Sequence, residues 1–250
     1  MSLFWLPEFP TTILALLAAT AFLAGLSRGF SGFGAALIFV PLASSLIGPK
    51  LATPILAVID LIFAAHLIPR AWTIGDRREV AVMFLGALFG IPAGTMILRN
   101  FDPLTLRWMI AGMATAMFLL ILSGWRYHGK PHPSATVAVG AVSGLFGGIA
   151  QIGGPPVVSY WLGTGREPAR LRANIILFFA ASGLFSFISY WWGGLLSEAV
   201  VKLSIVAGPG YGIGTYLGTH IFGLASPSTF RVASLVLIAL AVVTSLPIFG

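Results

Sequence analysis

Apolar stretches of 18 or more residues follow one another along almost the whole chain. A helix needs about 20 such residues to cross a bilayer, so each stretch is long enough to be a transmembrane segment. Charged residues make up only 8% of the 250 positions, whereas a soluble domain uses about 25% to cover its surface. The sequence therefore predicts an all-α protein that crosses the membrane several times and faces lipid over most of its surface.

The chain also contains an internal repeat, which has to be recognised before any fold is assigned. Three blocks match in the same order between the two halves: Gly25-Leu26 with Gly144-Leu145, Gly90-x-x-x-Gly94-Thr95 with Gly210-x-x-x-Gly214-Thr215, and Asp102-Pro103 with Ser226-Pro227. Single glycine matches are common in membrane proteins, but three ordered blocks indicate a duplication. We expect a first repeat over residues 1–128 and a second over 129–250, in one membrane domain.

Each repeat is predicted to hold one long segment followed by three transmembrane helices. The segments lie at 11–47, 51–69, 79–98 and 104–124 in the first repeat, and at 134–162, 168–192, 199–222 and 228–248 in the second. Asp102-Pro103 and Ser226-Pro227 have the N-cap side chain and the following proline that begin a helix. Glycines spaced by four residues in 79–98 and 199–222 predict close packing of these two helices in the bundle interior.

The long first segment of each repeat is interrupted by glycine. At 37 and 29 residues, 11–47 and 134–162 are too long for one crossing and short for two. The glycine-rich run 29–34, and the run 147–156 with its two prolines, disfavour a continuous helix. Irregular backbone at membrane depth has to be buried in protein or line a watery cavity, so we predict two helical hairpins that turn back within the membrane.

The cations of the loops favour this hairpin arrangement. If both long segments turn back, the thirteen loop Lys and Arg residues divide nine against four, with Lys50, Arg99, Arg107 and Lys202 on the poorer side. If both cross once, they divide six against seven, which the positive-inside rule disfavours. Each half then has an odd number of crossings, so the repeats are inverted and both termini lie outside. Inverted repeats with broken segments near the midplane are typical of secondary transporters.

Arg28 is the cation that lies outside the loops, at the turn of the first broken segment. A cation at this depth costs about 3 kcal/mol or more on insertion scales, which makes it a candidate functional residue. The planar guanidinium fork suits an oxyanion, so we predict that Arg28 binds an anionic substrate. The alternatives are that Arg28 reaches one membrane face or only pairs with a carboxylate.

Asp60 is a carboxylate near the middle of segment 51–69. It is predicted either to couple transport to protons or to act as counter-ion for Arg28 when no substrate is bound. A permanent ion pair, or a position closer to one membrane face, is the other interpretation.

The other candidate substrate-binding residues belong to the two broken segments and to the helix that follows the second. They are Gly29, Ser31, Gly32, Gly34, Gln151, Gly153, Gly154 and Asn174. Helix N-termini and freed backbone N–H groups at such breaks attract anions. The Gln151 and Asn174 side chains are expected either to donate to a substrate oxygen or to bond neighbouring helices.

Several function classes lack their sequence signatures. The chain has no Cys, no G-x-x-x-x-G-K-[ST] loop for ATP, and no His/Asp/Glu cluster at metal-ligand spacing. The cations are scattered over the loops and do not form the stripe that nucleic-acid binding needs. We expect no catalytic residue, no cofactor, no metal and no nucleic-acid partner.

The run from Ser27 to Leu42, and its counterpart from Gly144 to Pro156, resemble the sulfite exporter TauE/SafE family over essentially the whole chain. The block Gly-Phe-Gly followed by Val40-Pro41-Leu42 is the most specific part. The resemblance implies a transporter that moves sulfite or a small organosulfonate across the bacterial inner membrane, commonly as export. An anion channel, and less readily a membrane-embedded enzyme, remain the alternatives. The exact substrate, the coupling ion and the oligomeric state stay open.

Overall fold

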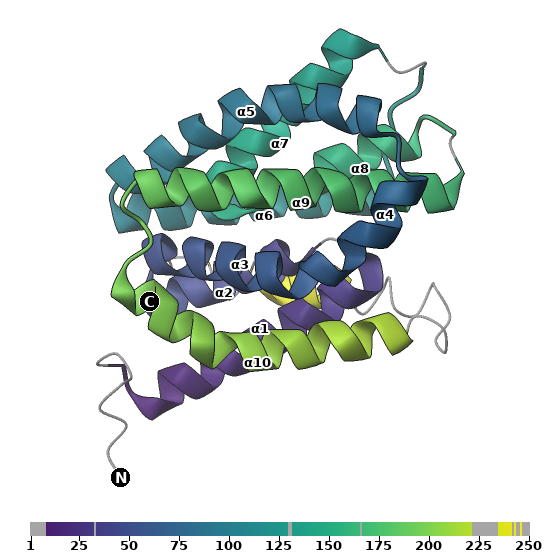
Figure 1. Cartoon of the computed structure of the whole chain (residues 1–250). Coiled ribbons are helices and arrows are strands. Elements are labelled where there is room, and N and C mark those ends of the chain that lie inside the picture. Colours follow the sequence, from purple (N-terminus) through teal and green to yellow (C-terminus); the bar gives the residue numbers. More distant parts are fainter. Residues whose placement is uncertain are drawn as a thin grey trace.

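The computed structural model describes residues 9–32, 34–129, 132–165, 167–221, 235–241, 243 and 246, without the side chains of residues 30, 31 and 221. Within this part the chain is helical and contains no strand. Its elements are α1 (Thr11–Ser31), α2 (Ala35–Ile47), α3 (Pro49–Ala64), the 3-10 turn η1 (Ala65–Leu67), α4 (Ile68–Ile74), α5 (Arg77–Asn100), α6 (Pro103–Ser123), α7 (Pro133–Ala150), α8 (Gly154–Leu162), α9 (Pro168–Trp192) and α10 (Glu198–Ile221) (Figure 1). Residues 235–241 are also helical, while the remainder of the expected segment 228–248 lies largely outside the described residues.

Six of the described helical segments are long and apolar enough to cross a membrane. They are Thr11–Gly29, Pro49–Ile74, Arg77–Asn100, Pro103–Ser123, Pro133–Ala150 and Pro168–Trp192. The chain is therefore a multi-pass membrane protein, as its composition predicts.

Both long first segments are broken at the glycines. The first is interrupted at residues 32–34, between α1 and α2, and the second at residues 151–153, between α7 and α8. With 13 and 9 residues, α2 and α8 rise by about 20 Å and 14 Å at 1.5 Å per residue. The hydrocarbon core is about 30 Å thick, so neither short helix crosses it alone, and both breaks lie inside the protein.

The expectation of one helix over 51–69 is wrong in its bounds. The helix begins at Pro49, changes to a 3-10 turn at Ala65–Leu67 and continues as α4 to Ile74. Pro69 explains the interruption, because its ring lacks an N–H and clashes with the carbonyl group four residues earlier, at Ala65. The tighter 3-10 turn accommodates this proline and separates α3 from α4.

The closest helix contacts join the two halves of the sequence. Glycines of α5 lie against backbone carbonyl oxygens of α7, in the pairs Gly86 with Val137, Gly90 with Ala141 and Gly94 with Leu145. Glycines of α1 meet α10 in the same way, in the pairs Gly25 with Tyr211 and Gly29 with Thr215. In both of these glycine contacts, called seams below, the residue numbers of the two helices rise together. The helix α5 therefore runs parallel to α7, and α1 runs parallel to α10 (Figure 1).

Further bonds fix the directions of the remaining helices. Asn174 and Ser189 of α9 bond Glu79 and Thr95 of α5, so these two helices also run parallel. Lys50, at the start of α3, donates to the carbonyl oxygen of Arg99, at the end of α5, so α3 runs opposite to α5. Figure 1 shows α10 turning back after α9, which makes α10 and α1 opposite in direction to α5, α7 and α9.

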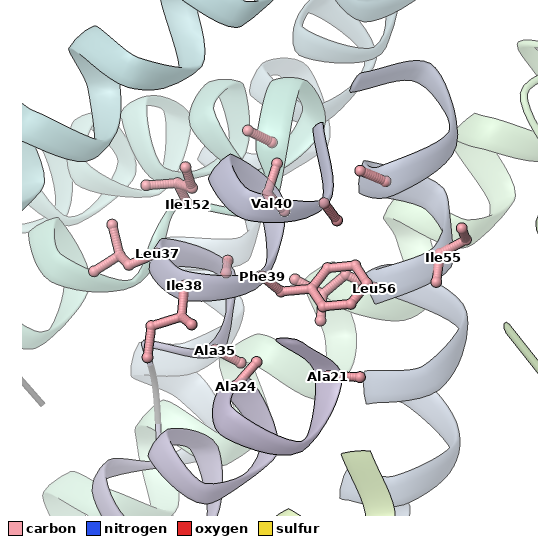
Figure 2. Close-up of a cluster of buried hydrophobic side chains, with 14 of the residues drawn as sticks. Ala21, Ala24, Ala35, Leu37, Ile38, Phe39, Val40, Ile55, Leu56 and Ile152 are labelled. Atoms are coloured by element: carbon pink, nitrogen blue, oxygen red, sulfur yellow. The ribbon is translucent and has the colours of Figure 1, made fainter. Parts of the chain in front are cut away.

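The buried side chains form two main clusters. One gathers residues of α1, α2, α3 and α10, and the other gathers residues of α5, α8 and α9. Figure 2 shows part of the first cluster, in which Phe39 and Val40 of α2 lie among side chains of α1 and α3, with Ile152 of the second break nearby. Each cluster thus combines helices from both halves of the chain, and the two breaks meet between them.

Candidate functional site

A cavity lies where the two breaks meet. It is lined by Gly34, Ala35, Ala36 and Leu37 from the first break, by Gln151, Ile152, Gly153, Gly154 and Pro155 from the second, and by side chains of α1, α3, α5, α7 and α9. Its volume is about 60 Å³, and one water needs about 10–15 Å³ on this measure. The cavity has room for a few waters or one small ion.

Arg28 reaches this cavity from the last turn of α1. Its Nη2 donates to Asp60 Oδ2 at 2.9 Å, and its Nε lies 2.9 Å from Asp60 Oδ1. Its Nη1 donates to the carbonyl oxygen of Gly32 at 2.5 Å. The Arg28 side chain is only 10% exposed, so it is held inside the protein by one carboxylate and one backbone carbonyl group. The interpretation that it reaches a membrane face does not fit this placement.

Asp60 connects the two halves of the chain. Besides the ion pair with Arg28 of α1, its Oδ1 accepts a hydrogen bond of 2.5 Å from the hydroxyl of Tyr211 on α10. Asp60 lies eleven residues after Pro49, near the middle of the span Pro49–Ile74. The carboxylate therefore meets a charged partner and a neutral donor at the depth of the two breaks.

Another part of the cavity lining comes from α9. Phe179, Ser182, Gly183 and Ser186 line it at the spacing of a single helix face. The guanidinium carbon of Arg28 lies 5.6 Å from the centre of the Phe179 ring, close enough for a cation–π contact. Ser182 donates to the carbonyl oxygen of Phe178 at 2.6 Å, which leaves its oxygen as an acceptor.

Gln151 stands at the second break in a conformation that is rare for its residue type. Its φ of 58° is left-handed, and its Nε2 donates to the hydroxyl of Tyr190 at 3.0 Å. Tyr190 in turn donates to the carbonyl oxygens of Gly147 and Gly148. The amide is therefore held by a buried tyrosine at the point where α7 ends.

Helix N-termini face the cavity from both breaks. α2 begins at Ala35 after Gly34, and α8 begins at Gly154 after Gly153; all four residues line the cavity. The first N–H groups of a helix have no partner within it and carry partial positive charge. Pro155 and Pro156 lack an N–H, so α2 offers more backbone donors than α8. Together with Arg28, these donors make the cavity suited to an anion.

A second, smaller cavity of about 20 Å³ lies beside the first, against η1. Gly32, Ala64 and Leu67 are among the residues that line it. Five residues line both cavities and so form the wall between them: Arg28, Asp60, Gln151, Phe179 and Gly183. The ion pair of Arg28 and Asp60 belongs to the barrier that separates the two spaces.

The structure brings most of the predicted site residues together. Arg28, Asp60, Gly34, Gln151, Gly153 and Gly154 line the larger cavity, and Gly32 lines the smaller one. Gly29 does not line either cavity, because it packs against the carbonyl oxygen of Thr215 on α10. The Ser31 side chain lies outside the described residues.

Asn174 has to be removed from the candidate site. It is fully buried near the start of α9, where its Oδ1 accepts from the N–H of Asp76 at 2.7 Å and its Nδ2 donates to Glu79 Oε2 at 3.3 Å. These bonds hold the corner between α4 and α5, and neither cavity includes Asn174 among its lining residues. The alternative interpretation, a bond between neighbouring helices, fits its position.

Some site residues carried no sequence signal of their own. Tyr211, Phe179, Ser182 and Ser186 are ordinary residues of apolar helices, and only the packing of α9 and α10 brings them to the breaks. Among the described residues, no group of three His, Asp or Glu side chains is arranged to hold a metal ion.

Comparison with known proteins gives the family. The family model described as Sulfite exporter TauE/SafE matches residues 17–245. The chain belongs to the sulfite exporter TauE/SafE family. The match covers both breaks and all residues that line the cavity, and the family is one of membrane transporters. Searches of curated proteins and of solved structures found no match to this TauE/SafE chain.

Proposed function

We propose that this TauE/SafE protein is a secondary transporter that exports a small sulfur-containing oxyanion or organosulfonate, such as sulfite or sulfoacetate. The observation that carries the proposal is the position of Arg28, whose guanidinium lines a small cavity between the N-termini of α2 and α8. A fork of charged donors and two helix N-termini supply hydrogen bonds and positive charge to the same few oxygen atoms.

The substrate replaces the Asp60 carboxylate as the partner of Arg28. Without substrate, Asp60 occupies the guanidinium of Arg28. An incoming oxyanion replaces Asp60 on Arg28. It also accepts hydrogen bonds from the N–H groups at the start of α2, from those of Gly153 and Gly154, and from the Gln151 amide. Protonation of Asp60 would remove the competing charge, which makes Asp60 the group that couples transport to a proton gradient.

Alternating access is supported by the two cavities and by the helix directions. The halves form inverted repeats in this proposal, because α1 runs opposite to α7, its counterpart, and α5 runs opposite to α10. The wall that contains Arg28, Asp60, Gln151 and Phe179 separates the two cavities. A substrate that breaks the Arg28–Asp60 pair opens this wall, and closure on the other side prevents a continuous pore.

The distribution of cations supports an orientation in the bacterial inner membrane. Arg70, Arg77, Arg78, Arg126, Arg170 and Arg172 lie at the end of the bundle that holds the corner between α4 and α5. Lys50, Arg99, Arg107 and Lys202 lie at the other end, where α1 also begins. The positive-inside rule makes the first end cytoplasmic and places the N-terminus outside; the loop cations 130, 166 and 231 lie outside the described residues.

Flux measurements in proteoliposomes test this function. The purified protein is reconstituted and uptake is measured for sulfite, sulfate, thiosulfate and small sulfonates, with and without a pH gradient. A transporter gives saturable uptake of at least one sulfur anion, accelerated by unlabelled substrate on the other side, and releases it chemically unchanged. Flux that rises linearly with concentration and shows no counter-transport would indicate a channel, and a modified product would indicate an enzyme.

A further inference from the structure

Tyr211 is fully buried in α10 and comes from the opposite half of the chain to Arg28 and Asp60. A buried tyrosine hydroxyl requires a hydrogen-bond partner, and here it donates to Asp60 Oδ1 at 2.5 Å. Asp60 thus has two kinds of partner, a cation that lines both cavities and could also bind a substrate anion, and a neutral hydroxyl that is not among the lining residues of either cavity.

The ring and backbone of Tyr211 are held firmly. Its ring packs against Phe63 of α3 with centroids 6.2 Å apart, and Phe63 also fits against Gly212 of the same helix as Tyr211. The carbonyl group of Tyr211 lies against Gly25 of α1, at a point where a Cβ has no room. The hydroxyl is therefore fixed relative to both the helix that carries Arg28 and the helix that carries Asp60.

The internal repeat gives Arg28, Asp60 and Tyr211 each an equivalent position in the other half of the chain. Asp60 corresponds to Phe179, because each lies eleven residues after the proline that begins α3 or α9. Arg28 corresponds to Gly147, because each lies four residues before the left-handed residue at its break. Tyr211 corresponds to Ile91, because each directly follows a glycine, Gly210 or Gly90, that packs against a neighbouring helix. One half of the site therefore holds a polar trio, and the equivalent positions Gly147, Phe179 and Ile91, which line the cavity, are apolar.

We infer that Tyr211 is a positioning residue for substrate exchange, which holds the Asp60 carboxylate when an anion has displaced it from Arg28. The inference rests on the proposed function. Before exchange, Arg28 and Tyr211 share the charge of Asp60. After exchange, the hydrogen bond from Tyr211 is the contact that remains, and without it a partly buried carboxylate would lack a donor, which is costly. Tyr211 lowers the free energy of the substrate-bound state more than that of the empty state.

The groups around Asp60 leave Tyr211 as its second donor beside Arg28. Among the described residues, the charged or titratable groups that face Asp60 are Arg28 from α1 and Tyr211 from α10, while α9 and the second break contribute Phe179, Gly183 and Gln151. His66 of η1 is exposed and bonds the carbonyl oxygen of Phe63 instead. An asparagine at position 60 carries no charge that needs a donor, so the contribution of Tyr211 to anion binding should disappear in Asp60→Asn.

Binding of a sulfur anion to the full-length protein tests the inference. The probe is the anion that the proteoliposome screen identifies, and affinity is measured in detergent at neutral pH. Tyr211→Phe should weaken binding about tenfold or more, the loss of one hydrogen bond to a charged group. In an Asp60→Asn background, Tyr211→Phe should change affinity little.

A matched control separates this role from general packing. Tyr160→Phe removes another buried hydroxyl, which lies 2.6 Å from Thr136 Oγ1, and should leave the affinity unchanged. If Tyr211→Phe does not fold, Phe63→Leu loosens the same ring and should show the same loss to a smaller degree, again only when Asp60 is present. A loss that persists in the Asp60→Asn background, or no loss, would overturn the inference. If the wild-type protein binds none of the anions, the proposed function fails first.

Discussion

Gly32 and Gln151 occupy the same place and the same left-handed backbone conformation in the two broken segments, with φ of 74° and 58°. Each residue directly follows the helix that ends at its break, α1 or α7. Glycine adopts this conformation without strain, whereas another residue pays about 1 kcal/mol. Among the described residues, Gln151 is the one non-glycine residue with a positive φ. A side chain retained at this cost, in the wall between two cavities, points to a functional role.

Replacing Gln151 should therefore separate stability from transport. Gln151→Gly relieves about 1 kcal/mol of backbone strain and loses a hydrogen bond of about the same value, so its unfolding temperature should stay near that of the wild type. Gln151→Ala loses the bond but keeps the strain, and should be less stable by about 1 kcal/mol. Both should transport sulfur anions more slowly. Full transport activity in Gln151→Gly would show that the amide does not act on the substrate.

Asp60→Asn should uncouple anion transport from the pH gradient. The amide cannot take up a proton during the cycle, and it no longer competes as an anion for Arg28, so binding of the substrate should be unchanged or stronger. Uptake in proteoliposomes, measured with and without a pH gradient, gives the coupling, and equilibrium binding gives the affinity. A variant that folds and still responds to the gradient would contradict this role, and a variant that does not fold would favour a permanent ion pair.

The glycine seam between α5 and α7 should tolerate no side chain. A Cβ at Gly90 would meet the carbonyl oxygen of Ala141 and, at 2.7 Å, the backbone nitrogen of Leu145, so Gly90→Ala should destabilise the protein by about 1–3 kcal/mol or more. Gly112 of α6 is the control, since nothing lies within 4 Å of its Cβ position. Gly112→Ala should be neutral or stabilising by up to about 1 kcal/mol. Thermal unfolding in detergent compares the two; equal effects would mean that the seam is looser than described.

The inverted arrangement predicts which loops share a membrane face. Thr73 and Thr164 should both be cytoplasmic, while Asn100 should lie outside. The chain has no native Cys, so single cysteines at these positions can be treated with an impermeant thiol reagent in intact cells. Only the cysteine at position 100 should react until the membrane is opened. Labelling of position 73 or 164 alone from outside would mean parallel halves, and one shared site between the breaks would then be abandoned.

Features that depend on local sequence could be predicted for this fold. The glycine runs at 29–34 and 147–156 marked both breaks, and 168–192 matches α9 (Pro168–Trp192). The 3-10 turn at Ala65–Leu67 was missed because Pro69 is the last residue of the expected helix, and a proline there predicts that the helix ends. The pairing of α1 with α10 joins distant parts of the chain, and spaced glycines indicate a close contact without naming the partner helix.

The site was predicted where charge alone identified it. Arg28 and Asp60 were singled out because charges at depth are costly, and they form an ion pair. Asn174 is also polar and is fully buried, but its bonds go to Asp76 and Glu79 at the corner between α4 and α5, which are far away in sequence. Tyr211 gave no signal, because a tyrosine in an apolar helix is common and its partner lies 151 positions away.

Binding of a sulfur anion to two variants tests whether a substrate anion takes the place of Asp60 on Arg28. Arg28→Ala alone would leave the Asp60 charge without its cation, so the comparison is between Asp60→Asn and the double variant Arg28→Ala/Asp60→Asn. The single variant should bind at least as tightly as the wild type. The double variant should lose binding on the order of 100-fold or more, because two charge-assisted hydrogen bonds disappear, while its helicity and elution volume stay unchanged. Equal affinity in the two variants would show that the substrate anion does not bind Arg28 in place of Asp60.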